Sequence, residues 1–177
     1  ENHGQAIWLD FLARGFVAQG DLQALLETDG VKGVTSNPSI FEKAIGSSDE
    51  YDGAIAQALK NGDRPVADLF EAVAVEDIQS AADVLRPVYD TSNGGDGFVS
   101  LEVSPYLAND AKGTIAEAER LWKDVKRKNW MVKVPATPEG LPAIEHLLGE
   151  GISTNITLLF SQQVYREVAE AYTSGLE

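Results

Sequence analysis

The chain contains no cysteine, and this absence removes several kinds of chemistry at once. Disulfide bonds, thiolate metal sites and a cysteine nucleophile are all excluded. The sequence has only two histidines, His3 and His146, and they lack the close spacing of a metal-binding pair. We therefore expect no metal site in this protein.

Basic residues are also scarce, with 14 lysines and arginines against 28 aspartates and glutamates and a formal net charge of -14. Binding to nucleic acid or to an anionic membrane surface needs a basic face, so we expect neither partner. A small anionic substrate is still allowed, because a few local lysines or arginines suffice to hold it. We interpret the overall acidity as solubility in the cytoplasm.

Long apolar runs are missing as well, since none approaches the roughly 18 to 20 residues that span a bilayer. The first residues, Glu1 to Gly4, have no basic-then-apolar signal pattern and do not include a methionine. Hydrophobic residues make up 44% and charged residues 24% of the 177 residues. These proportions are typical of a globular chain that is long enough for one domain with a buried core.

Short apolar runs alternate with helical patterns along the chain. The five predicted strands span residues 6–11, 31–36, 98–103, 130–136 and 152–160. Helices are predicted at 21–28 with Asp21 as N-cap, at 115–128, at 139–150 and at 161–172. This alternation predicts an α/β protein with a parallel sheet covered by helices. Five such units fit either a doubly wound sheet or part of an eight-stranded barrel, and periodicity alone does not choose.

Residues 39–89 form one long stretch with helical periodicity, which predicts two or three helices. Asn37 and Pro38 introduce it, with asparagine as N-cap and proline as the first helical residue. The segment 61–65, which contains asparagine, glycine and proline, interrupts it. A loop is predicted to follow at residues 90–97.

Lys133 is the most informative residue because it lies within one of the apolar runs, Trp130 to Ala136. Burial disfavours the charged form of a lysine, and a neutral amine attacks carbonyl groups to form Schiff bases. The residue therefore suggests an enzyme that acts on a ketone or an aldehyde. The alternative is a lysine whose stem packs in the core while its head reaches solvent at the strand end.

Every predicted strand carries a polar residue in or just after its apolar run, although buried parallel strands are usually continuous hydrophobic runs. These residues are Asp10, Thr35, Asn37, Glu102, Lys133, Asn155 and Thr157. The carboxyl ends of parallel strands meet on one side of a sheet, where barrel and doubly wound enzymes build their sites. A shared polar pocket is therefore predicted. The alternative is a set of separate residues, each satisfied locally or capping the helix that follows.

Four segments resemble the signatures of the transaldolase family, and they occur in the family's order along nearly the whole chain. They are Gly33–Phe41, Val99–Ser104, Met131–Thr137 and Ser153–Ser161, and the start Ile7–Asp10 looks like the larger bacterial branch, which includes fusions to phosphoglucose isomerase. The resemblance implies a (β/α)8 TIM barrel of class I aldolase type. It also implies a transferase of the pentose phosphate pathway that needs no cofactor.

The resemblance assigns the chemistry to two residues first. Lys133 matches the lysine that forms a Schiff base with the ketose carbonyl of sedoheptulose 7-phosphate or fructose 6-phosphate. Asp10 matches the acid/base that takes the hydroxyl proton as the adjacent carbon–carbon bond breaks. The dihydroxyacetone unit then stays on the lysine until it adds to an aldose phosphate.

The other site residues follow from the same resemblance. Glu102 matches a carboxylate that works through a water molecule, and Thr157 helps to hold that water. Asn37 and Asn155 match side chains that bind the dihydroxyacetone hydroxyls, and Thr35 lines the same pocket. Two alternatives stay open, an aldolase that releases free dihydroxyacetone and an inactive fragment with a structural or assembly role.

The chain departs from the family pattern in its length. Five strand–helix units are predicted where the barrel needs eight, and the serine and arginine that grip phosphate in the family lie beyond the match at Phe160. We therefore expect residues 1–177 to be the amino-terminal part of one barrel domain, with a helical insertion at about 39–89. We also expect this part alone to be poorly active and to need the remainder of the barrel, or a fused isomerase domain, as its partner.

Overall fold

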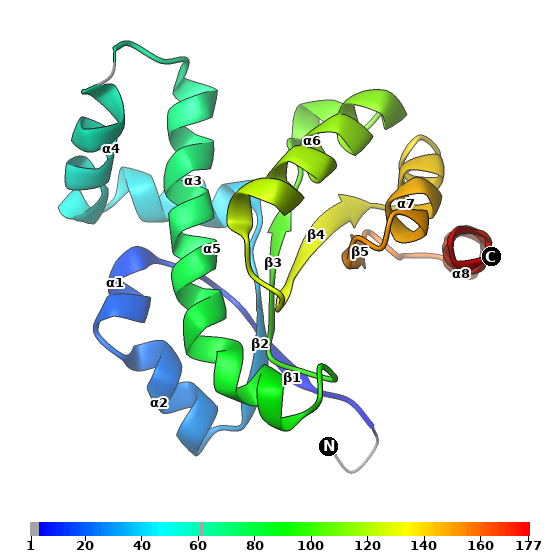
Figure 1. Ribbon diagram of the computed structural model, residues 1–177, viewed down its shortest axis with the longest axis horizontal. Coiled ribbons are helices and arrows are strands. Elements are labelled where there is room, and N and C mark those ends of the chain that lie inside the picture. The colour runs from blue at the N-terminus through cyan, green and yellow to red at the C-terminus, as the bar shows by residue number, and fades with distance from the viewer. Residues whose placement is uncertain (1–3, 61) are drawn as a thin grey trace. The chain divides into compact units, whose positions relative to one another are not determined.

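The computed structural model describes residues 4–60 and 62–177 (Figure 1). Two compact units make up the chain. The N-terminal unit contains residues 1–99 and 127–129, and the C-terminal unit contains residues 100–126 and 130–177. The five strands belong to one sheet with the sequential order β1-β2-β3-β4-β5. A sequential order without reversal is that of a barrel and not of a doubly wound sheet, whose strand order reverses at a switch point.

The N-terminal unit is mostly helical. Its strands are β1 (Ile7–Asp10), β2 (Val31–Thr35) and the start of β3 (Phe98–Glu102). Its helices are α1 (Arg14–Ala18), α2 (Asp21–Thr28), α3 (Pro38–Gly46), the 3-10 helix η1 (Asp49–Tyr51), α4 (Asp52–Leu59) and α5 (Val66–Thr91). The three α-helices α3, α4 and α5 occupy the region where two or three were predicted. Asn61, within the predicted break, lies outside the described residues.

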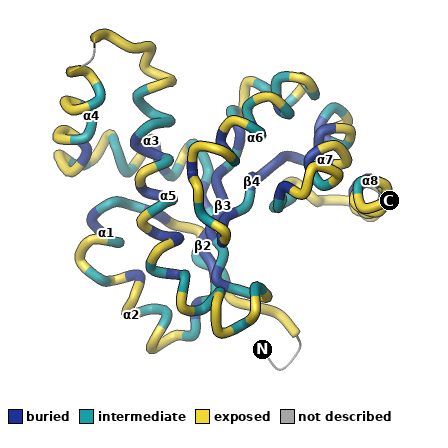
Figure 2. The backbone as a smooth tube through the Cα atoms, in the orientation of Figure 1, coloured by how far each residue is buried: buried dark blue, intermediate teal, exposed yellow. Residues whose placement is uncertain are grey.

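Helix α5 provides much of the core of this unit. Its apolar residues recur at helical spacing, so that buried and exposed stretches alternate along it in Figure 2. The fully buried members include Ile78, Ala81 and Leu85. Strands β1 and β2 pair in parallel, with Trp8 beside Gly33. Gly33 allows the indole to lie close, because a Cβ at this position would come within 2.3 Å of the Trp8 ring.

The C-terminal unit alternates strands and helices regularly. It contains the rest of β3, the 3-10 helix η2 (Pro105–Leu107), α6 (Ala111–Val125), β4 (Trp130–Pro135), α7 (Gly140–Gly149), β5 (Thr154–Thr157) and α8 (Gln162–Leu176). Strands β4 and β5 pair in parallel. Helix α7 approaches the end of β4 so closely that a Cβ at Gly140 would lie 2.1 Å from the Pro135 carbonyl oxygen.

Several predicted element boundaries were wrong, for local reasons. Helix α6 begins at Ala111 and not at residue 115, because the Asp110 side chain caps it by accepting from the Gly113 N–H at 3.0 Å. It ends at Val125 because Lys126 adopts a left-handed conformation with φ of 53°. Strand β5 stops at Thr157, before the predicted end at residue 160. The next residue, Leu158, has a left-handed backbone with φ of 68°.

Other differences concern helix ends. Helix α2 has Gly20 as its N-cap, and Asp21 is its first helical residue. Helix α5 continues to Thr91, into the predicted loop, and α8 runs to Leu176. Helix α1 was not predicted at all. No helix among the described residues is long and apolar enough to cross a bilayer.

Gly97 gives a test of the N-terminal unit. It has φ of 82°, and a Cβ there would lie 2.3 Å from the Tyr89 backbone nitrogen. We expect Gly97→Ala to lower the free energy of unfolding by about 2 kcal/mol or more, because both the dihedral and the contact are unfavourable. Gly53→Ala in α4, where a Cβ meets open space, should leave it unchanged or raise it by up to about 1 kcal/mol. Equal urea midpoints for the two variants would contradict this account.

Candidate active site

Lys133 and Glu102 form an ion pair in the C-terminal unit. The Lys133 Nζ lies 3.4 Å from the Glu102 Oε2, and the two side chains are 10% and 17% exposed. Lys133 stands in the middle of β4, and Glu102 is the last residue of β3. The pairing is anchored by the backbone, since the Val103 N–H donates to the Lys133 carbonyl at 3.1 Å. The amine therefore lies beside a carboxylate with little access to water.

The sequence around Lys133 explains its burial. Val132 and Val134 are fully buried on either side of it, and Lys133 itself is 8% exposed. Successive side chains of a strand point to opposite faces, so both faces of β4 are covered here. The interpretation in which the lysine head reaches solvent at the strand end therefore does not fit this geometry.

Asn155 and Thr157 come from β5, the neighbouring strand. Asn155 is the register partner of Lys133, and Thr157 is that of Pro135. The Asn155 Nδ2 donates to the Oγ of Ser100, a fully buried residue of β3, at 3.0 Å. This hydrogen bond orients the amide, and the sequence did not point to Ser100 as its partner.

Asp10 and Thr35 lie in the N-terminal unit. They are the last residues of β1 and β2, and they are register partners in the parallel pair. Asp10 is exposed and Thr35 is half-buried. Both thus stand at the carboxyl end of their strands, the end at which the sequence predicted the polar residues to gather.

Asn37 has a structural role that can be stated directly. Its Oδ1 accepts from the Ile40 N–H at 3.0 Å and caps helix α3, with Pro38 as the first helical residue. This confirms the predicted cap. A role of Asn37 in binding a substrate stays a prediction.

The predicted site residues thus fall into two groups. The N-terminal unit holds Asp10, Thr35 and Asn37, and the C-terminal unit holds Glu102, Lys133, Asn155 and Thr157. Strand register pairs Asp10 with Thr35 and Lys133 with Asn155, and the ion pair joins Glu102 to Lys133. The meeting of Asp10 with Lys133 and Glu102 in one pocket joins residues of different units and stays a prediction.

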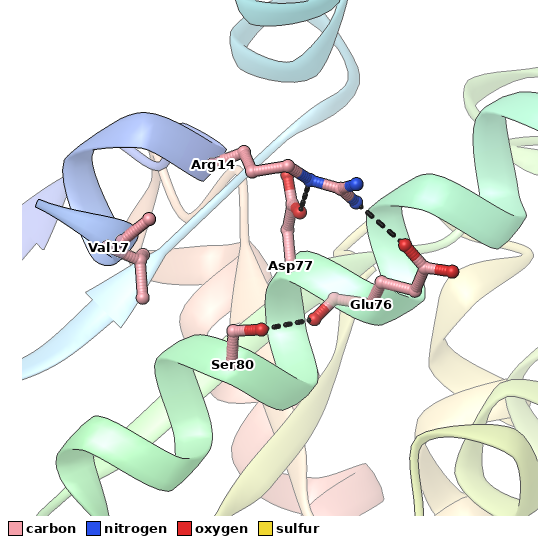
Figure 3. Close-up of a pocket in the computed structure, with 6 residues that line it drawn as sticks. Arg14, Val17, Glu76, Asp77 and Ser80 are labelled. Atoms are coloured by element: carbon pink, nitrogen blue, oxygen red, sulfur yellow. Dashed lines mark hydrogen bonds and ion pairs between the residues drawn. The ribbon is translucent and has the colours of Figure 1, made fainter. Parts of the chain in front are cut away.

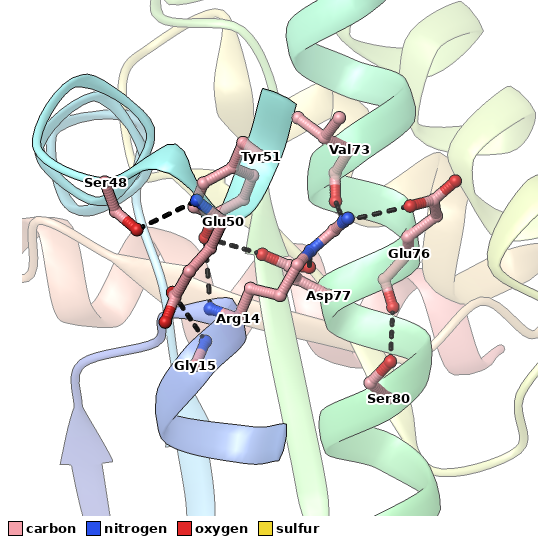
Figure 4. Close-up of polar contacts among 9 residues, drawn as sticks. All are labelled: Arg14, Gly15, Ser48, Glu50, Tyr51, Val73, Glu76, Asp77 and Ser80. Carbon is pink, nitrogen blue, oxygen red and sulfur yellow. Dashed lines mark hydrogen bonds and ion pairs between the residues drawn. The ribbon is translucent and has the colours of Figure 1, made fainter. Parts of the chain in front are cut away.

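The structure also shows a charged cluster that the sequence analysis missed. Its centre is Asp77 on α5, which accepts from the Arg14 Nε and the Tyr51 hydroxyl, each at 2.8 Å (Figure 4). A cavity of about 260 Å³ lies beside it (Figure 3). It is lined by Arg14, Val17, Ala18, Glu76, Asp77 and Ser80. Val73, Asp77 and Ala81 follow one another at intervals of one helical turn on α5. An acidic residue on this otherwise apolar face was the sequence signal that could have revealed the cluster.

Burial dominates the electrostatics of the cluster. Desolvation raises the pKa of Asp77 above its ordinary value, although the hydrogen bonds from Tyr51 and Arg14 act in the opposite direction. Desolvation also raises the pKa of Tyr51 well above its usual range, so the phenol stays protonated and donates. Burial lowers the pKa of Arg14, but the bonds to Asp77 and Glu76 together outweigh it and raise that pKa.

The raised pKa of Asp77 predicts a pH dependence of stability. The folded state binds this proton more tightly than the unfolded chain, so the contribution of Asp77 to the free energy of unfolding falls as pH rises from about 4 through its folded pKa. Urea denaturation over a pH series should show that the wild-type value minus the Asp77→Asn value decreases in this direction. A difference that grows with pH would mean that Arg14 and Tyr51 outweigh burial.

Among the described residues, no group of three or more histidines, aspartates or glutamates is placed to hold a metal ion.

The sequence matches the family described as Transaldolase/Fructose-6-phosphate aldolase over residues 7–176. It is 45% identical to Transaldolase 2 of Nostoc punctiforme over all 177 residues, which are 46% of that protein. It is 48% identical to the transaldolase of Mycobacterium tuberculosis over 174 residues, 98% of this chain and again 46% of the relative. This chain belongs to the transaldolase/fructose-6-phosphate aldolase family.

Proposed function

We propose that this chain carries the Schiff-base residues of a transaldolase, which moves a dihydroxyacetone unit from a ketose phosphate to an aldose phosphate. The observation that supports this most directly is the buried amine of Lys133 beside the carboxylate of Glu102, 3.4 Å away. A carboxylate at this distance can take the proton that the ammonium must lose before the amine attacks a carbonyl. We place the reaction in the pentose phosphate pathway of the cytoplasm.

The reaction begins with loss of a proton from the Lys133 ammonium. The amine attacks the ketose carbonyl carbon, and the resulting carbinolamine loses water to give a protonated imine. Glu102 accepts and returns protons in these steps, directly or through one water molecule within hydrogen-bonding reach. Thr157 helps to hold that water. Proton transfer by a positioned group of this kind accelerates a step by roughly 10²- to 10⁴-fold.

Cleavage follows on the imine. Asp10 takes the proton of the hydroxyl next to the bond, the carbon–carbon bond breaks, and its electron pair is delocalised onto the imine nitrogen as an enamine. An aldose phosphate leaves. The enamine carbon then attacks the aldehyde of a second aldose phosphate, Asp10 returns the proton, and hydrolysis of the new imine frees Lys133.

We assign substrate recognition to the amides of Asn155, within β5, and Asn37, at the start of α3. The hydrogen bond from Asn155 to Ser100 fixes the amide plane, and we expect its carbonyl oxygen to accept from a dihydroxyacetone hydroxyl. Asn37 and Thr35 would complete the contacts to the three-carbon unit. The chain spans about half the length of the curated relatives it matches. We propose that the phosphate contacts and full activity require the segment that corresponds to the rest of those proteins.

Replacing Lys133 tests the nucleophile. We expect Lys133→Arg to lower dihydroxyacetone transfer by at least about 10³-fold, because arginine keeps a positive charge beside Glu102 but cannot form the imine. The measurement is transfer from fructose 6-phosphate in a polypeptide that extends this chain to the length of its relatives. Lys112→Arg, at an exposed lysine on α6, is the matched control and should keep full activity. Activity retained by Lys133→Arg would end the proposal.

The matched family includes aldolases that act on fructose 6-phosphate, so product analysis must separate two activities. With fructose 6-phosphate and an aldose phosphate acceptor, we expect a new ketose phosphate and no free dihydroxyacetone. Transfer occurs without release of dihydroxyacetone if the enamine stays bound to Lys133 until the acceptor arrives. Accumulation of free dihydroxyacetone in proportion to the aldose phosphate released would assign the chain to the aldolase branch instead.

A further inference from the structure

Helix α1 begins only four residues after Asp10 and has no cap of its own. Its N-cap is Ala13, with extended dihedrals and no side-chain hydrogen bond. The first backbone N–H groups of a helix have no partner within the helix, and alanine offers no acceptor. A helix of five residues also has little intrinsic stability. The start of α1 therefore depends on groups from elsewhere.

The 3-10 helix η1 supplies both acceptors. The Arg14 N–H donates to the Tyr51 hydroxyl at 3.1 Å, and the Gly15 N–H donates to the Glu50 Oε2 at 2.9 Å (Figure 4). Gly15 allows the Glu50 carboxylate to come this close, because a Cβ at residue 15 would lie 2.0 Å from the Glu50 Oε1. Residues about 35 positions later in the chain thus cap α1 in place of a local side chain.

Asp77 closes this arrangement into a ring. Tyr51, which receives the Arg14 N–H, donates its own hydroxyl proton to the Asp77 Oδ2, and the Arg14 Nε donates to the Oδ1 of the same carboxylate. The guanidinium also lies over the Tyr51 ring, 5.0 Å from its centroid. Hydrogen bonds to a buried charge are stronger than neutral ones, and linked bonds reinforce one another. The Arg14 backbone is therefore held by Tyr51, and its side chain by Asp77 and also by Glu76, whose Oε2 accepts from Nη2 at 2.9 Å.

The consequence for Asp10 follows from the short connection. Asp10 is held on one side by its register with Thr35 in β2. On the other side, the chain passes through the fully buried Leu12 and reaches the ring at Arg14. The backbone around Asp10 is thus fixed at both ends, although its side chain is exposed and free to meet a substrate.

We propose that Glu50, Tyr51 and Asp77 are positioning residues that set the placement of Asp10 for carbon–carbon bond cleavage. The inference rests on the proposed function, because it assumes that Asp10 moves the hydroxyl proton. A misplacement of about 1 Å is enough to slow a reaction by roughly 10²-fold. Imine formation at Lys133 precedes the step that uses Asp10, so loss of the ring should affect the two steps differently.

The experiment measures these two steps separately in the polypeptide extended to the length of its relatives. Imine formation is read as borohydride-trapped adduct on Lys133 with fructose 6-phosphate, and cleavage as release of aldose phosphate in a single turnover. The variants are Tyr51→Phe, which removes only the hydroxyl, and Glu50→Ala at an exposed position. Glu50→Gln replaces the carboxylate with an amide, whose oxygen can still accept from the Gly15 N–H. Asp83→Asn is the control, because Asp83 also lies on α5 and pairs with an arginine, Arg127, which lies outside α1.

We expect Tyr51→Phe and Glu50→Ala to keep the adduct within about twofold and to slow cleavage by roughly 10- to 100-fold. Glu50→Gln should restore most of the cleavage rate, and Asp83→Asn should change neither step. Unchanged cleavage in both variants would overturn the inference. So would a parallel loss of adduct and cleavage that follows the folded fraction. Absence of any Lys133 adduct in the unsubstituted protein would overturn the proposed function, and the inference with it.

Discussion

The C-terminal unit depends on one constraint, the burial of a lysine amine in an apolar strand. Lys133 lies between two fully buried valines, and an unpaired ammonium at this position would cost several kcal/mol. Glu102, at the end of the adjacent strand, provides the compensating carboxylate. The backbone bond from Val103 to Lys133 holds the two strands in the register that keeps this pair together. The same pairing leaves a shielded amine beside a carboxylate.

The N-terminal unit also contains a buried charged group that is paired with neighbouring side chains, but its charge has the opposite sign. Here the buried group is the carboxylate of Asp77, and Arg14 and Tyr51 provide the donors. The compensation reaches further than a pair, since the Tyr51 oxygen also accepts the first N–H of α1. A short helix that its own sequence does not stabilise is therefore held by a polar ring anchored on α5. In both units, hydrogen bonds or ion pairs from neighbouring elements offset part of the cost of a buried charge.

The sequence predicted the parts of this structure that depend on local pattern. Apolar runs located all five strands, and Asn37 followed by Pro38 located the start of α3, because these signals lie within a few neighbouring residues. Helix α1 has no such local signal, because its capping groups come from Glu50 and Tyr51. The partners of Asp77 are equally distant in the sequence, since they are Arg14 and Tyr51. The sequence pattern also extended β5 beyond Thr157, since apolar Leu158 to Phe160 do not reveal a left-handed backbone. Lys133 was recognised because a charged residue in an apolar run is a local anomaly, whereas the ion pair itself required the strand register.

The most direct test of the account is to locate the covalent bond. Fructose 6-phosphate and borohydride would be added together to the polypeptide extended to the length of its relatives, and the digested protein would be analysed by peptide mass. The account predicts added carbohydrate mass on the peptide that contains Lys133 and on no other lysine. An unmodified Lys133 peptide, or an adduct found at another lysine such as Lys32, would contradict it.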